Sequence, residues 1–306
     1  MGVLANNPKV YDLVASSVQV EKIATGFWFT EGPIWHPDGY LLFSDMPADV
    51  RRKWTEAEGI VEVMKPANKC NGMTLDADLS LIVCEHWTSH VVRAALNPDG
   101  TEASREVIAS HYGDEELNSP NDVVVKSDGS IYFSDPTYGR MDVYGNPREL
   151  QMDVQGVYRI PPGGGGLQRL ADDFQQPNGL CFSPDESTLY VNDSGILHVR
   201  RYSVNADGTI SGGEVILDGI GSPDDFDGGI CDGMKCDEQG NIWVTGPGGV
   251  WVVSPDGEHL GTVEVPEHTG NLNWGGADWN VLYVPSSTSV YRFPTKVRGT
   301  PVAYMR

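Results

Sequence analysis

The 306-residue chain carries 21 Lys and Arg residues against 43 Asp and Glu residues, a formal net charge of −22 at neutral pH. This acidity argues against nucleic acid or an anionic membrane surface as a partner, because both would repel the protein. The 36 Gly and 20 Pro residues disfavour coiled coils and helical bundles, whose helices they would interrupt. No stretch approaches the ~20 consecutive apolar residues of a membrane-spanning helix.

The N-terminal region and the cysteines bear on the compartment. Residues 1–20 show no basic region followed by an apolar run, so no signal peptide is visible. The five cysteines are odd in number, are scattered along the chain and include no CxxC pair. We therefore expect a cytoplasmic protein with reduced, buried thiols.

In chain order, one sequence pattern recurs six times: an acid or amide, usually a small residue, alternating apolar positions, a tight turn and an apolar strand. The copies are EGPIWHPDGYLLFSD from Glu31, NGMTLDADLSLIVCE from Asn71, NDVVVKSDGSIYFSD from Asn121, NGLCFSPDESTLYVND from Asn178, DGMKCDEQGNIWVTG from Asp232 and, more loosely, NLNWGGADWNVLYVPS from Asn271. Each copy predicts two short strands around a turn, because Pro-Asp-Gly and Ser-Asp-Gly favour turn geometry. Further strand-like runs, such as HVVRAALNPDG, lie between the copies.

Four strands in each unit of roughly 40–50 residues are typical of a β-propeller blade. Six units predict an all-β fold, a six-bladed β-propeller with four-stranded blades, in which residues 1–306 form a single domain. We expect one end of the chain, residues 18–24 or residues 301–306, to supply the strand that closes the ring. A β-sandwich or a two-domain α/β protein is the alternative, but a sandwich would not need six matched copies, and no strong helical period is present. The glycine run at residues 163–166 predicts a strand-connecting turn.

The residues that open the six repeats all carry a side-chain oxygen. We call them the ring residues, and they are Glu31, Asn71, Asn121, Asn178, Asp232 and Asn271. Equivalent positions of successive blades are related by rotation about the central channel, so these oxygens would converge at one mouth of it. Converging oxygens with two carboxylates, and without Cys or His, favour a hard cation such as Ca²⁺ or Mg²⁺. The alternative is that Asn and Asp open strands because they tolerate turn conformations.

The motifs FTEGPIWHPDG, SPNDVVVKSDGSIYFSDPTYG, QPNGLCFSPDESTLYVND and CDGMKCDEQGNIWV resemble those of the gluconolactonase/regucalcin (senescence marker protein) family. The resemblance covers all six repeats and implies a propeller that hydrolyses sugar lactones with one divalent cation near the axis. It implies Glu31, Asn178 and Asp232 as metal ligands, with Asn121 as a fourth contact to the metal or to substrate. Some family members hold the substrate with an arginine two residues before the Asn121 position, where this chain has Ser119.

A cation at this place would polarise the lactone carbonyl and stabilise the developing oxyanion. By analogy and by position, Asp232 is the expected catalytic base. We expect Asn71 and Asn121 to bind the hydroxyl groups of the substrate, His86 to contact the substrate or shuttle a proton, and Tyr138 to line the substrate pocket. The alternatives are an exposed loop histidine at His86 and a packed aromatic residue at Tyr138.

Other positions are interpreted as structural. Asp45, Asp135 and Asp193 recur after the second strand of a blade, which indicates turn capping. Cys70 and Cys231 adjoin ring positions, and we expect them to face a neighbouring strand or blade. No GxSxG elbow and no HExxH motif is present, which argues against a covalent serine hydrolase and a zinc protease.

The sequence therefore predicts a metal-dependent hydrolase of a sugar lactone, with glucono-1,5-lactone as the favoured substrate and Ca²⁺ as the favoured cation ahead of Mg²⁺, Zn²⁺ or Mn²⁺. The enzyme alternatives are another aldonolactonase, acting on xylono- or galactono-lactone, and a phosphotriesterase-like hydrolase on the same metal platform. The non-enzymatic alternative is a propeller interaction module. We expect a small-molecule partner and a monomer or a small homo-oligomer.

Overall fold

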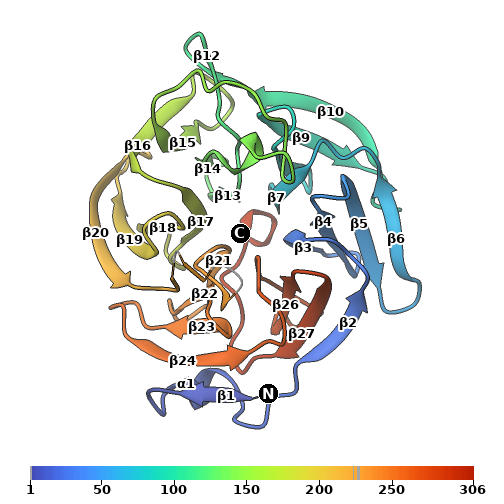
Figure 1. The fold of residues 1–306 in the computed structure, drawn as a ribbon, viewed down its shortest axis with the longest axis vertical. Coiled ribbons are helices and arrows are strands. Elements are labelled where there is room, and N and C mark those ends of the chain that lie inside the picture. Colours follow the sequence, from blue (N-terminus) through green and yellow to red (C-terminus); the bar gives the residue numbers. More distant parts are fainter. Residues whose placement is uncertain (1, 223, 226–227) are drawn as a thin grey trace.

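The computed structural model describes residues 2–222, 224–225 and 228–306. Small antiparallel sheets stand around a central channel like the blades of a propeller (Figure 1). The predicted all-β, six-bladed propeller is therefore confirmed. The turn predicted at residues 163–166 connects two strands of the third blade. Among the described residues no helix is long and apolar enough to cross a membrane.

Blades 1 to 4 each contain four strands that follow one another in the chain, whereas blades 5 and 6 also take in a strand from the N-terminal segment. Blades 1 and 2 comprise β3 (Thr30–His36), β4 (Tyr40–Asp45), β5 (Val50–Thr55) and β6 (Gly59–Met64), then β7 (Cys70–Leu75), β8 (Leu81–Glu85), β9 (His90–Leu96) and β10 (Glu102–Ala109). Blades 3 and 4 comprise β13 (Val123–Val125), β14 (Ile131–Asp135), β15 (Gln155–Ile160) and β16 (Gln168–Phe174), then β17 (Pro177–Phe182), β18 (Thr188–Asp193), β19 (His198–Val204) and β20 (Ile210–Asp218). Blades 5 and 6 comprise β21 (Met234–Cys236), β22 (Ile242–Gly246), β23 (Gly249–Val253) and β24 (His259–Glu264), then β25 (Asn273–Gly275), β26 (Val281–Ser286), β27 (Ser289–Pro294) and β2 (Glu21–Thr25).

The N-terminal segment closes the ring. Strand β2 pairs antiparallel with β27, so blade 6 combines strands from both ends of the chain. Of the two ends that the sequence offered, the N-terminal one is correct, and its strand lies at Glu21–Thr25. Blade 5 departs from the four-stranded prediction, because β1 (Val3–Ala5) adds a fifth strand beside β24 and is followed by the short helix α1 (Val10–Leu13).

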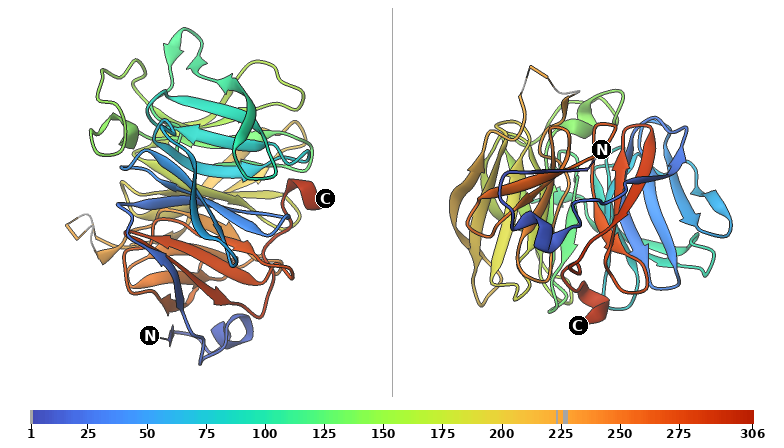
Figure 2. Two further views of the ribbon diagram at one scale, coloured as in Figure 1. Left: turned by 90° about the vertical axis from the view of Figure 1, so that its right-hand side faces the viewer. Right: turned by 90° about the horizontal axis from the view of Figure 1, so that it is seen from below.

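The C-terminal segment lies on one face of the propeller. It ends in the 3₁₀ turn η3 (Ala303–Met305), which lies over the far end of the channel near the centre of the ring (Figures 1 and 2). A small hairpin of β11 (His111–Tyr112) and β12 (Glu115–Glu116) precedes blade 3, and the turn η1 (Tyr138–Arg140) follows β14. Figure 2 places η1 on the face opposite the C-terminus.

The small residue after most ring positions has a steric reason. A Cβ at Gly32 would lie 1.9 Å from the carbonyl oxygen of Asn71, and one at Gly179 would lie 2.1 Å from that of Asp232. The innermost strands of neighbouring blades therefore approach one another too closely for a side chain. Glycine at these positions brings the ring residues close to one another at the axis.

The core lies between blades, because the inner strands are buried on both sides. Every residue of β4, β8, β14 and β22 is buried, while the outermost strands β10 and β20 remain largely exposed. Trp243 of blade 5 meets Trp274 of blade 6 edge to face, with ring centroids 5.5 Å apart. Such apolar contacts between sheets hold the blades, and hence the ring residues, in fixed positions.

Glu267 joins the two ends of the chain at the closure of the ring. Its carboxylate accepts hydrogen bonds from Tyr291 Oη (2.7 Å), Ser289 Oγ (2.6 Å) and Lys22 Nζ (3.1 Å). Although burial opposes ionisation, these donors and those of Thr288 lower the pKa of Glu267 to about 2. A carboxylate with a lowered folded pKa stabilises the fold above its unfolded pKa, and this contribution is lost as the pH falls toward 2.

We therefore expect Glu267→Gln to lower the free energy of unfolding at neutral pH by about 2 kcal/mol, which corresponds to about 4 °C in Tm. The difference between the variant and the wild type should shrink below about pH 4. Thermal denaturation at several pH values measures it. Glu58→Gln is the control, because this exposed residue makes a single ion pair with Lys53 and should cost less than about 0.5 kcal/mol. Equal Tm losses in both variants would contradict the closure role.

Candidate active site

A cavity with about 360 Å³ of empty volume, part of it open to solvent, lies at the channel mouth. The described residues that line it are Phe29, Glu31, Met46, Asn71, His86, Asn121, Tyr138, Tyr144, Asn178, Ile230 and Asp232. All seven site residues proposed from the sequence are among them, and their roles stay predictions. The sixth ring residue, Asn271, stands behind Glu31 and donates from Nδ2 to its Oε2 (2.9 Å).

The two acids at the base of the cavity are almost fully buried. Glu31 is 2% exposed, and Asp232 is 8% exposed. Burial raises the pKa of Glu31 to about 7, although hydrogen bonds from Asn271 and from the backbone of Gly32 favour the carboxylate. Burial and the neighbouring charge of Glu31 also raise the pKa of Asp232 well above its usual range. Two carboxylates held close together and away from water call for a cationic partner.

The amides of the ring provide unpaired acceptors in the same place. Asn71 Oδ1 and Asn178 Oδ1 are buried without a hydrogen-bond partner. Their amide nitrogens are engaged: Asn178 Nδ2 donates to Ser194 Oγ (2.9 Å), and Asn71 Nδ2 lies 3.3 Å from His86 Nε2. Buried acceptors without a partner are uncommon in protein interiors, and these two belong to residues that line one cavity.

This donor set fits a divalent cation. Glu31 and Asp232 supply charge, and Asn178 supplies a free amide oxygen, which is the oxygen-only chemistry that Ca²⁺ and Mg²⁺ prefer. No group of three or more His, Cys, Asp or Glu side chains is arranged for a metal within the described ranges. The three candidate donors, Glu31, Asn178 and Asp232, offer two carboxylates and one amide.

His86 is fully buried beside the cavity, so the alternative of an exposed loop histidine is wrong. Its Nδ1 lies 3.2 Å from the carbonyl oxygen of Tyr144, which only an N–H can satisfy, so Nε2 is left to accept from Asn71 Nδ2. Burial lowers the pKa of His86 to about 4. A neutral His86 with this tautomer fixes the amide of Asn71 with its oxygen free.

We expect His86 to leave no inflection in the pH dependence of the activity between about pH 5 and pH 8, because it stays neutral there. His86→Phe should lower kcat/KM about tenfold, since it leaves the Asn71 amide free to rotate. Profiles of kcat/KM against pH for both proteins measure this. A wild-type inflection near pH 6.5 that disappears in the variant would contradict the neutral, orienting role.

Ser119 occupies the position at which some family members have a substrate-binding arginine. Ser119 Oγ donates to the carbonyl oxygen of Pro136 (2.6 Å) and accepts from the backbone N–H of Gly139 (2.9 Å). A Cβ at Gly139 would lie 2.5 Å from the Cβ of Ser119. A long side chain at residue 119 would therefore collide with η1, whose Tyr138 lines the cavity.

Several contributors were missed by the sequence interpretation. Phe29, Met46, Tyr144 and Ile230 form an apolar part of the lining. Phe29 and Ile230 each lie two residues before an acid that opens a repeat, so their position in the repeat could have found them. Tyr144 comes from the long connection between β14 and β15, which carries no repeat signal. Beneath the ring, Lys235 Nζ lies 3.3 Å from Asp122 Oδ2, an ion pair that joins blades 5 and 3.

The residues interpreted as structural behave accordingly. Asp135 accepts the backbone N–H groups of Asn118 (2.9 Å) and Ser119 (2.7 Å), and Asp193 accepts those of Gln175 and Gln176. Asp45 does the same for Trp28 and Phe29. These acids cap the turns that lead into the inner strands, as predicted.

The two cysteines beside ring positions also contact neighbouring blades. Cys70 Sγ lies 3.3 Å from Ser44 Oγ of blade 1, and Cys231 Sγ lies 3.5 Å from the carbonyl oxygen of Asp193 in blade 4. Burial raises the pKa of both thiols, which disfavours the nucleophilic thiolate.

The fold and the site define a six-bladed propeller with a small-molecule cavity on its axis, floored by acids and amides. Residues 29–288 match the model of the SMP-30/gluconolactonase/LRE-like region, and the chain belongs to this family. It is similar to a gluconolactonase of Zymomonas mobilis, 32% identical over 96% of this chain and 86% of the relative. A pentonolactonase of Haloferax volcanii is 26% identical over 84% of this chain and 81% of that protein. The structure of a gluconolactonase from Xanthomonas campestris superposes with a TM-score of 0.86, at 28% identity and with 96% and 95% of the two chains covered.

Proposed function

We propose that this protein is a carboxylic-ester hydrolase that opens glucono-1,5-lactone to gluconate with the help of a bound divalent cation, Ca²⁺ being favoured. The observation that carries the proposal is the cavity floor, where two buried carboxylates and two unpaired amide oxygens face one small space. Family membership and the lactonases among its relatives support the reaction class.

Glu31, Asn178 and Asp232 would hold the cation, with Asn121 as a further contact. When bound, such a cation polarises a carbonyl and stabilises negative charge on its oxygen. The positive charge also keeps both acids ionised, which burial alone disfavours.

In this proposal, Asp232 takes a proton from a water molecule that attacks the lactone carbonyl carbon. The ring C–O bond then breaks, and the proton returns to the departing oxygen, so that a hydroxy acid leaves. Asn71 offers its free Oδ1 to a substrate hydroxyl, and Tyr138 and Phe29 shield the reacting ester from bulk water. An aldonolactone is already a reactive ester, so a base stabilised by a neighbouring cation suffices.

A pH-stat assay on a panel of lactones, with and without chelator, tests the proposal. We expect hydrolysis of glucono-1,5-lactone that is lost with chelator and restored by added Ca²⁺. Faster turnover of xylono- or galactono-lactone would make that aldonolactone the preferred substrate and keep the reaction class. Hydrolysis of a phosphotriester alone, hydrolysis that is insensitive to chelator, or no hydrolysis at all would refute it.

A further inference from the structure

We infer that the cavity also takes lactones that carry an alkyl substituent, with the lactone group on the polar floor and the alkyl chain along one wall toward the rim. The inference rests on the proposed function and adds a second substrate class to it. Water adds to the carbonyl carbon, the ring C–O bond breaks, and the product is a hydroxyalkanoic acid.

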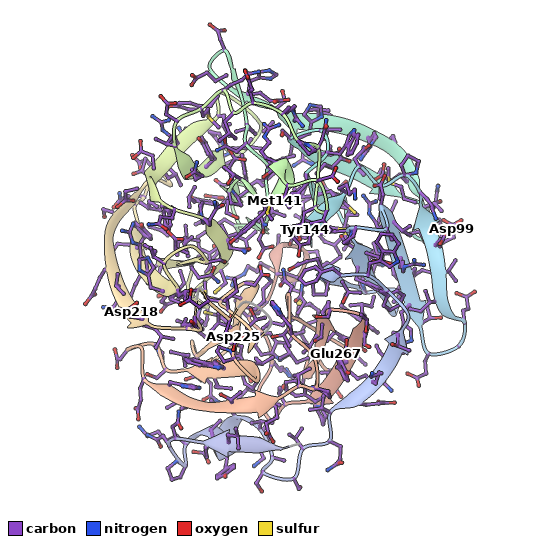
Figure 3. The ribbon with its side chains drawn as sticks, viewed as in Figure 1. Asp99, Met141, Tyr144, Asp218, Asp225 and Glu267 are labelled. Carbon is purple, nitrogen blue, oxygen red and sulfur yellow. The ribbon has the colours of Figure 1, made fainter. Side chains whose placement is uncertain are left out.

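The wall is built from apolar side chains of separate parts of the ring. Phe29 of blade 1 packs edge to face against Tyr144, with ring centroids 5.7 Å apart, and Met46 and Ile230 complete the apolar lining. Figure 3 shows Tyr144 and Met141 near the centre of the ring. An alkyl group of a bound substrate would therefore leave water for an apolar surface.

The apolar side chains of this wall, Phe29, Met46 and Ile230, cannot pair with the hydroxyl groups of a substrate. None of the described lining side chains is Lys or Arg, and both ring nitrogens of His86 are already engaged. The unpaired amide oxygens, Asn71 Oδ1 and Asn178 Oδ1, belong to the polar floor with Glu31 and Asp232. Hydroxyl groups placed against Phe29, Met46 and Ile230 would lose hydrogen bonds to water without replacing them.

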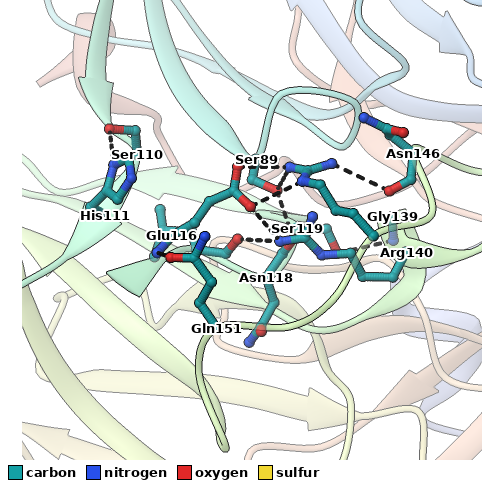
Figure 4. Close-up of polar contacts among 12 residues, drawn as sticks. Ser89, Ser110, His111, Glu116, Asn118, Ser119, Gly139, Arg140, Asn146 and Gln151 are labelled. Carbon is teal, nitrogen blue, oxygen red and sulfur yellow. Dashed lines mark hydrogen bonds and ion pairs between the residues drawn. The ribbon is translucent and has the colours of Figure 1, made fainter. Parts of the chain in front are cut away.

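The segment that carries Tyr144 is pinned in place, so the wall is preformed. Arg140 Nη2 donates to Glu116 Oε2 (3.1 Å) and to the carbonyl oxygen of Leu117 (2.8 Å), contacts that lie in the cluster of Figure 4. The backbone N–H of Asn146 donates to the carbonyl oxygen of Gly139 (2.8 Å), and the carbonyl oxygen of Val143 accepts from Lys69 Nζ (3.2 Å). A preformed apolar wall selects for shape and hydrophobicity at little entropic cost.

Several exposed apolar residues lie close in sequence to residues that line the cavity. Trp28 is next to Phe29 and is 69% exposed, and Trp87 is next to His86. Met141 and Val143 lie between the lining residues Tyr138 and Tyr144, and both are about half exposed. We place the outer end of the alkyl chain against these side chains, because large exposed apolar side chains mark surfaces that bind apolar groups.

The test compares δ-valerolactone with δ-hexalactone, δ-octalactone and δ-decalactone in the pH-stat assay, beside glucono-1,5-lactone. We expect kcat/KM to rise about threefold for each added methylene until the chain passes the rim, as expected for partial burial of CH₂ groups. Trp28→Ser and Val143→Ser should flatten this dependence. Val107→Ser is the matched control, because Val107 is similarly exposed but lies on the outer strand β10, and it should keep the wild-type slope.

The outcomes separate the two proposals. Chelator-sensitive hydrolysis of glucono-1,5-lactone without any dependence on alkyl chain length would overturn the inference and leave the proposed function standing. An equal loss of slope in Val107→Ser and Val143→Ser would also overturn it. If none of these lactones is hydrolysed, the proposed function fails, and the inference fails with it.

Discussion

Glu31→Gln and Asp232→Asn are each expected to lower kcat/KM for glucono-1,5-lactone by about 10²–10³-fold and to abolish tight binding of Ca²⁺. Each substitution keeps the shape of the side chain but removes one of the two charges that we propose to hold the cation and, through it, the developing oxyanion. The pH-stat assay measures the first effect, and isothermal titration calorimetry with Ca²⁺ alone measures the second.

Asp237→Asn is the matched control, because Asp237 is also a buried acid of blade 5. Its carboxylate accepts from Trp243 Nε1 (3.0 Å) and from the Asn241 side chain, and it does not line the cavity. This variant should lose thermal stability but keep kcat per folded molecule and keep Ca²⁺ binding. Full activity in both Glu31→Gln and Asp232→Asn would show that the two acids do not form the reaction centre.

Removal of the cation should destabilise the protein at alkaline pH more than at acid pH. In the metal-free protein the pKa of Glu31 is raised by burial from 4.5 to about 7. An acid with a raised folded pKa is easier to ionise in the unfolded chain, so stability is fully present below about pH 4.5 and declines as the pH rises toward 7. The full difference for Glu31 is about 3 kcal/mol, and the raised pKa of Asp232 adds to it in the same direction.

We expect chelator to lower Tm by about 5 °C or more near pH 8 and to have a much smaller effect near pH 5, where protons replace the cation on the two acids. Thermal denaturation with chelator and with excess Ca²⁺ at both pH values measures this. Glu31→Gln provides the internal check, because without metal it should be more stable than the wild type near pH 8. A chelator effect that is independent of pH would place the cation away from these acids.

Much of the fold could be predicted from the sequence because most of each blade of a propeller is formed by one short, continuous stretch of the chain. Each repeat contains its own turn and its own pair of strands, and the glycine after Glu31, Asn71, Asn178 and Asp232 reports the close approach of inner strands. The recurrence of Asp45, Asp135 and Asp193 likewise reports the caps that lead into those strands. The location of the ring residues at the channel mouth could therefore be predicted from their place in the repeat.

The remaining features depend on contacts between distant segments. Strand β1 pairs with β24 of blade 5, and Val3 lies opposite Val263. These residues are far apart in the sequence, so no local pattern predicts their pairing. His86 was open to two interpretations, and its burial against the carbonyl oxygen of Tyr144 decides against an exposed position.

By itself, the sequence determined the six blades and the ring of acids and amides, since each follows from a short repeated pattern. It limited the closing strand to one of the two ends of the chain. Only the tertiary structure decided which end closes the ring, which amide oxygens stay unpaired, and that an apolar wall faces the polar floor. The physical reason is that hydrogen-bond satisfaction, desolvation and cavity shape belong to side chains that meet from different blades and connections. The pKa values of Glu31 and Asp232 are raised because the fold buries both carboxylates, and the charge of Glu31 adds to the effect on Asp232.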